Sequence, residues 1–201
     1  MRIPISGEAG AMGRVHARFH LDSLSHNGDI AFISMNGKLS HDHKDGSTSE
    51  LDGSMDELVR QSRKLTESIA PGYDFTREIR LTEELALGDT ILLFDGDSLV
   101  AFAVCHSVPL VEGRVREELR VLKLVSRNAE DFEVLISALS DHARRSGTRR
   151  VALRMQGQYA GAYRRLMQRG ARVRWSDLRM TLEGYAEVVP SAGIVLSNWE
   201  I

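Results

Sequence analysis

The chain has 201 residues, of which 42% are hydrophobic and 27% are charged, and its formal net charge is −2. This composition is typical of a globular protein with a sizeable core. The small net charge argues against a nucleic-acid binder, which usually carries a clustered basic excess. Cys105 is the only cysteine, and no apolar run approaches the ~18 residues of a membrane span. We therefore expect a cytoplasmic protein without an internal disulfide that binds neither nucleic acid nor membrane.

Two strands are predicted near the start of the chain. Apolar and polar residues alternate from Arg14 to Leu21, which is the pattern of a half-buried strand. Asn27 and Gly28 then form a strong turn signal, and residues 30–35 predict a second strand.

A polar stretch follows at residues 40–53, and we expect it to be an exposed loop. It contains His41 and His43, but no second cluster of ligands accompanies them, so we predict no metal site. We divide the chain here into two parts. Residues 1–50 form a strand-rich segment with a polar linker, a vestige of a preceding domain in our interpretation, and residues 51–201 form the main domain.

The main domain opens with two helices and a hairpin. Ser54 and Glu57 form a capping box that begins a helix ending at Pro71, and a second helix begins near Asp74 or Thr76. The Asp95-Gly96 turn lies between apolar runs at residues 90–94 and 99–108, which predicts a β-hairpin.

A strand–helix–strand crossover forms the centre of the predicted fold. Residues 119–125 predict a buried strand, and residues 149–155 a second one. Asn128 is a suitable N-cap for the intervening helix, because its side chain can accept from the amide of Asp131. Gly147 ends that helix. Such a crossover makes the two strands parallel neighbours or near-neighbours.

The remaining pattern predicts one more helix, at residues 159–169, and short strands at 172–175 and 178–182. An apolar run follows at residues 194–196. The fold class is therefore α/β of the mixed α+β kind. We expect a mixed, mostly antiparallel sheet of about six or seven strands, flanked by about four helices.

The order of these elements over residues 29–184 resembles the GNAT-type acyl-coenzyme A N-acetyltransferase domain. The run from Ala162 to Gly170 looks like the family's fourth-helix signature. Gly88–Thr90, Ala103–His106 and Leu196–Trp199 are similar to the second half of bacterial tandem-GNAT proteins. The resemblance implies a GNAT-like fold, acetyl-CoA as cofactor and an amine as acceptor.

The resemblance also implies where acetyl-CoA would bind. Its pantetheine arm would lie in the notch where the two central parallel strands part, and its phosphates would meet the start of the following helix. The residues implied are Leu122, Lys123, Leu124 and Val125 along the strand, and Arg127, Asn128 and Ala129 at the helix start.

The family's glycine fingerprint is missing at this point. The chain reads Ser126-Arg127-Asn128-Ala129-Glu130-Asp131, without a glycine that would let backbone amides approach a pyrophosphate. Glu130, Asp131 and Glu133 place negative charge where the phosphates would lie. Arg127 is the only nearby cation well placed to offset Glu130 and Asp131.

Three residues are candidates for acid–base chemistry. His106 ends an apolar strand and could act as a general base for an amine, or it is a partly exposed strand-end histidine. Glu118 precedes the central strand, where related enzymes often place an acidic base, or it is simply solvated. Tyr163 lies one helical turn from the family's usual general-acid position, or it belongs to the core.

Lys123 is a cation inside an apolar strand. It needs a partner or a phosphate, or it extends to solvent at a sheet edge.

Two functions are open at this point. The chain is an acetyl-CoA-dependent N-acetyltransferase with an atypical coenzyme loop, which takes a small-molecule amine and acyl-CoA. Alternatively, it is a catalytically silent GNAT-like module that binds a ligand or a partner. A homodimer is compatible with either function.

Overall fold

The protein was analysed as a computed structural model, which describes residues 14–21, 30–33, 39–42, 48–50, 55–109, 117–180, 182, 184 and 190–197. The helices are α1 (Met55–Ile69), α2 (Thr76–Glu84), α3 (Ala129–Arg145) and α4 (Ala160–Gln168). The strands are β1 (Arg14–Leu21), β2 (Ile30–Ile33), β3 (Leu39–Asp42), β4 (Thr48–Glu50), β5 (Gly88–Asp95), β6 (Ser98–His106), β7 (Glu118–Ser126), β8 (Arg150–Gln156), β9 (Arg172–Arg179) and β10 (Ile194–Ser197).

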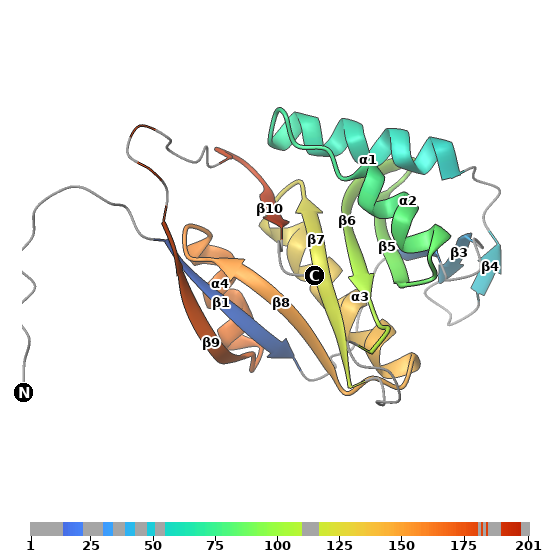
Figure 1. Cartoon of the computed structure of the whole chain (residues 1–201). Coiled ribbons are helices and arrows are strands. Elements are labelled where there is room, and N and C mark those ends of the chain that lie inside the picture. Colours follow the sequence, from blue (N-terminus) through green and yellow to red (C-terminus); the bar gives the residue numbers. More distant parts are fainter. Residues whose placement is uncertain are drawn as a thin grey trace, which may run out of the picture.

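These ten strands form one sheet (Figure 1). Along the main path their order is β4-β3-β2-β5-β6-β7-β8-β1-β9, and β10 pairs with β7 beside this path. Of the pairings that the structure describes, only β7 with β8 is parallel. The strands within residues 14–50 thus belong to the same sheet as those of residues 51–201.

Helices cover both faces of this sheet (Figure 1). α1 and α2 pack on one face against β5 and β6, whereas α3 packs on the other against β5, β6, β7 and β8. The alternation of a β-strand divides its side chains between these two cores. In β5, Ile91 and Leu93 belong to the core under α3, and the intervening Leu92 belongs to the core under α1.

The predicted crossover is confirmed. Residues 118–120 of β7 lie beside residues 150–152 of β8 in a parallel register, and α3 connects the two strands. Asn128 is the N-cap of α3, and its side chain accepts a hydrogen bond from the Asp131 amide at 2.8 Å. The hairpin at Asp95-Gly96 is confirmed as well, because β5 and β6 pair antiparallel around it.

Three sequence-based expectations about strands are wrong. The sheet has ten described strands rather than six or seven. Residues 39–42 and 48–50, within or beside the predicted polar loop, form β3 and β4. Residues 172–179 form one strand, β9, instead of two. Antiparallel strands at the end of a sheet can be polar on a wet face, so their sequences lack an apolar signal. His43 and Ser54 lie outside the described residues.

β9 contains a bulge within its pairing with β1. β1 pairs with β9 in one register from Ala17 to Ser176 and in another from Phe19 to Val173. Two residues of β9, Arg174 and Trp175, therefore lie opposite a single residue of β1. Such a bulge shifts the alternation of side chains within one continuous strand.

We predict that Asn128→Ala lowers the free energy of unfolding by about 0.5–2 kcal/mol, because the amide of Asp131 loses its acceptor. Urea denaturation of the variant beside the parent measures this change. Asn128→Ser is the matched control, since its hydroxyl can still cap the helix. Equal losses in both variants would show that the cap contributes little.

Candidate functional site

The notch predicted to hold the coenzyme is filled by the chain's own strand β10. β8 pairs with β7 over residues 118–120, and from Lys123 to Ser126 β7 pairs with β10 instead. A strand has two edges, and β6 holds the other edge of β7 along residues 120–126. β10 therefore continues along the edge that β8 leaves, beside the residues implied to bind pantetheine.

Tyr159 binds β10 on the side that faces away from β7. Its hydroxyl donates to the carbonyl of Val195 at 3.2 Å and accepts from the amide of Val195 at 3.1 Å. Because these groups of Val195 face Tyr159, the backbone groups of Ile194 and Leu196 face β7. The chain's sequence suggested neither contact, although Tyr159 begins a predicted helix and Val195 lies in an apolar run.

The residues before β10 lie against the turn between β7 and α3. Gly193 has a φ of +77°, which favours glycine. A Cβ at this position would lie 2.7 Å from Cγ2 of Ile69 and 2.8 Å from the carbonyl oxygen of Ser126. The backbone at Gly193 therefore packs closely where a bound phosphate was expected to lie.

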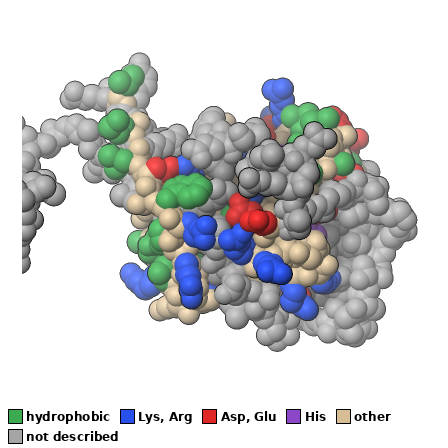
Figure 2. Space-filling view, turned by 60° about the horizontal axis from the view of Figure 1, so that its bottom comes forward, with side chains coloured by type: hydrophobic (Ala, Val, Ile, Leu, Met, Phe, Trp, Pro, Cys, Tyr) green, Lys and Arg blue, Asp and Glu red, His purple; other side chains and the backbone are tan. Residues whose placement is uncertain are grey.

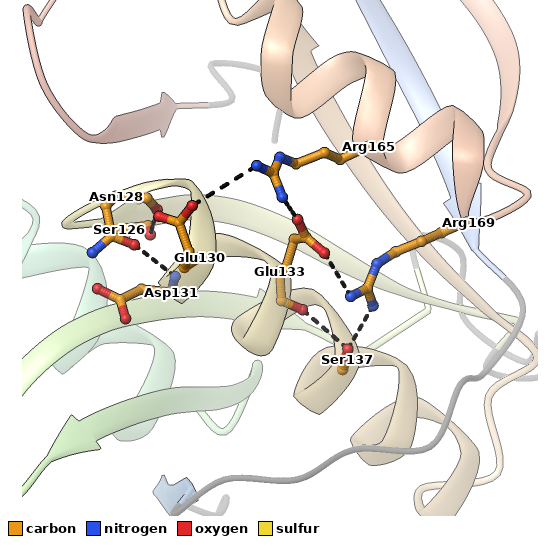
Figure 3. A network of polar contacts seen from close by, with 8 residues as sticks. All are labelled: Ser126, Asn128, Glu130, Asp131, Glu133, Ser137, Arg165 and Arg169. Carbon is orange, nitrogen blue, oxygen red and sulfur yellow. Dashed lines mark hydrogen bonds and ion pairs between the residues drawn. The ribbon is translucent and has the colours of Figure 1, made fainter.

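The start of α3 already satisfies several of its own polar groups (Figure 3). Asn128 caps the Asp131 amide, and the Ser126 hydroxyl donates to the Asn128 carbonyl at 2.7 Å. Arg127 donates to Asp131 at 2.9 Å and to Asp95 at 3.3 Å. The pKa of Arg127 is raised, first because Asp131 accepts its hydrogen bond. Ala129, the last implied residue, is the first residue of α3.

Two acidic residues of α3, Glu130 and Glu133, lie against arginines at α4, as Figure 3 shows. Arg165 forms an ion pair with Glu133 and lies 3.8 Å from Glu130. Arg169 binds Glu133 at 2.9 Å and donates to the Ser137 hydroxyl at 2.7 Å. The expectation that Arg127 is the only nearby cation is therefore wrong, because α4 lies against this end of α3.

Lys123 has partners inside the protein. It is buried, and its Nζ donates to the Ser197 hydroxyl at 2.8 Å. The same nitrogen lies 3.5 Å from a carboxylate oxygen of Glu78 and 5.2 Å from the ring centre of Phe75. Since β7 lies within the sheet, Lys123 does not extend to solvent at an edge. Leu122, Leu124 and Val125 are buried on either side of it.

His106 and Glu118 lie near the other end of β7. His106 pairs in register with Arg120 of β7. Arg120 lies five residues before Val125, so His106 is roughly 17 Å along the strand from Val125. Its Nε2 is 3.1 Å from the Thr82 hydroxyl. Burial first, and then the Arg120 charge, lower the pKa of His106 to about 4. The imidazole is therefore neutral at pH 7 and a weaker base than expected.

Tyr163 lies in a third place, on α4, where it packs against the core. It lines a groove together with Met155, Met167 and Val173. The three candidate catalytic residues are therefore distributed over the molecule. Glu118 shares one end of the sheet with His106, and Tyr163 lies apart from both.

Two comparisons with known proteins were made for the whole chain. No protein-family model matches the chain, and no curated protein matches it. Within the described part of the chain, no helix is both long and apolar enough to cross a membrane. The same residues contain no group of three His, Cys, Asp or Glu side chains placed to hold a metal ion.

We predict that Tyr159→Phe lowers the free energy of unfolding by about 1–3 kcal/mol, because both buried backbone groups of Val195 lose their partner. Urea denaturation measures the change in the free energy of unfolding, and amide hydrogen exchange at Val195 should become faster. Tyr73→Phe is the control, since no hydrogen bond joins the Tyr73 hydroxyl to any residue that the structure describes. A stable variant with unchanged exchange would contradict the role of Tyr159.

The lowered pKa of His106 predicts a pH dependence of stability. Between about pH 6.5 and pH 4 the unfolded chain protonates this imidazole and the folded chain does not. The free energy of unfolding should therefore fall as the pH falls through this window. We expect His106 to contribute on the order of 1–2 kcal/mol, allowing for its partial exposure. Urea titrations at several pH values should show a shallower decline for His106→Gln, and parallel curves would contradict the assignment.

Proposed function

We propose that the chain is a catalytically silent GNAT-like module that works by binding a partner. The observation that carries this proposal is the pairing of β10 with residues 123–126 of β7. This strand uses the backbone edge along which the pantetheine arm of acetyl-CoA would have to lie. Tyr159 and the close packing at Gly193 hold the segment there.

The alternative, an active N-acetyltransferase, requires β10 to leave this position. Ile194, Val195 and Leu196 are each buried. Exposing three such side chains costs on the order of 5–9 kcal/mol, at about 1.5–3 kcal/mol each. A micromolar ligand supplies only about 8 kcal/mol in total. Displacement would therefore consume most of the binding energy of an ordinary coenzyme site.

The distribution of the candidate residues also supports the silent module. A general base and a general acid must lie within hydrogen-bond reach of one reacting group. His106 and Tyr163 belong to different parts of the fold, and His106 is neutral beside Thr82 and Arg120. The start of α3 offers no glycine turn, and its charged side chains are engaged with one another.

Calorimetry with acetyl-CoA tests the proposal. We expect the parent chain to show no binding up to about 1 mM, and its unfolding midpoint to be unchanged by the coenzyme. Leu196→Asp should loosen β10, and Leu178→Asp is the matched control at an exposed position. Binding to the parent at micromolar concentration, with acetyl transfer to an amine, would overturn the proposal and favour the enzyme.

A further inference from the structure

The exposed apolar side chains of the protein gather at one end of the sheet. Among the described residues, seven large apolar side chains are exposed, and six of them lie on α4, on β9 or just beyond β9. They are Met167, Val173, Trp175, Leu178, Met180 and Leu182. Figure 2 shows hydrophobic side chains gathered along this end, at its left, beside basic ones. Clustering of this kind marks an interaction surface rather than scattered exposure.

The backbone of β9 offers an edge at the same place. β9 is the last strand in the sheet order, and β1 pairs with only one of its edges. No strand that the structure describes pairs with the other edge. An edge strand carries a row of amide and carbonyl groups that an additional strand can use.

An apolar groove borders this edge. It has a volume of about 650 Å³ and lies between α4, the end of β8 and β9. Its lining residues are Met155, Gly157, Ala160, Tyr163, Arg164, Met167, Val173 and Ser176. Val173 belongs both to this lining and to β9, so a strand added at the edge would direct alternate side chains into the groove.

The charge of this surface is basic. Arg164, Arg172 and Arg174 are exposed, and no ion pair joins them to any residue that the structure describes. Asp177, in contrast, is already paired with Arg154 of β8. Acidic side chains would therefore complement the surface, whereas β9 of a second copy would bring the same arginines against it.

Arg172 and Arg174 lie on the face of β9 that is turned away from the groove. Val173 faces the groove, so its neighbour Arg172 projects from the other face. Arg174 belongs to the bulge opposite one residue of β1 and shares that other face. Ser176, after the bulge, again lines the groove. The side of β9 toward α4 is thus mainly apolar with Arg164 at the groove, and Arg172, Arg174 and Trp175 lie on the other side.

We propose that the outer edge of β9 binds an extended peptide in which apolar and acidic residues alternate. The peptide adds a strand to the sheet, places its apolar side chains in the groove and its carboxylates near Arg172 and Arg174. This inference rests on the proposed function, since it names the partner of the binding module. The occupant is an acidic peptide rather than a second copy, because the arginines oppose self-pairing.

The test uses a fluorescein-labelled, end-capped peptide of eight alternating valine and glutamate residues, and follows its anisotropy with the full chain. We expect saturable binding at least about tenfold tighter than for the valine–lysine peptide. The same peptide with an N-methyl group on every amide should lose binding, because it cannot pair along either edge. Equal binding of these three probes, or no binding, would overturn the proposal.

Variants locate the site. Arg172→Glu with Arg174→Glu should weaken binding of the glutamate peptide by roughly tenfold and reverse the preference toward the lysine peptide. Arg149→Glu, at an exposed arginine outside the groove and β9, should leave both affinities unchanged. An unaltered preference in the double variant would overturn the proposal.

Two further outcomes would show that the edge of β9 binds a different partner, and either one would overturn the proposal. Sedimentation that shows a dimer excluding the peptide would assign the edge to a second copy. A single-stranded oligonucleotide of equal charge that binds as tightly as the glutamate peptide would assign it to nucleic acid. Acetyl-CoA is titrated into the same samples, so that peptide binding together with coenzyme binding overturns the silent-module proposal alone.

Discussion

The interaction on which this structure depends is the pairing of β7 along its second edge. β7 is buried through most of its length, and buried backbone groups must find hydrogen-bond partners. β8 supplies partners only as far as Arg120. The rest of that edge needs another strand or a ligand. In this chain β10 takes the place, so one constraint explains both the path of the C-terminal segment and the lack of an open notch.

A second set of contacts makes the start of α3 part of the scaffold. Arg165 and Arg169 come from α4, and their partner Glu133 lies on α3, more than thirty residues away in sequence. Asp131 binds Arg127, and Asp95 extends that contact to the β5–β6 turn. Glycines introduced here would remove charges that hold two helices and a hairpin together. The acidic helix start is therefore better understood as structural than as a damaged phosphate site.

Local signals in the sequence were sufficient for the centre of the fold. The Asn128 cap, the turn at Asp95-Gly96 and the crossover each depend on residues close together in the chain, so propensity and periodicity identify them. The occupant of the notch could not be predicted, because its partners are distant in sequence: Tyr159 lies 36 residues before Val195. β3 and β4 also lack an apolar signal, and the lowered pKa of His106 depends on burial that no pattern reveals.

The sheet has two strand edges that need an explanation, one on β7 inside the sheet and one on β9 at its end, and the chain treats them differently. Inside the sheet, β10 pairs with the part of the β7 edge that β8 leaves. The apolar residues of β10 are buried, and the backbone groups of Val195 that face away from β7 bind the Tyr159 hydroxyl. Outside, β9 combines exposed apolar side chains with exposed arginines. Charges on an edge strand usually prevent pairing with identical chains, since like charges meet across a two-fold axis. The same charges leave the edge accessible to a strand of opposite sign, so protection against self-association and selection of an acidic partner follow from one arrangement.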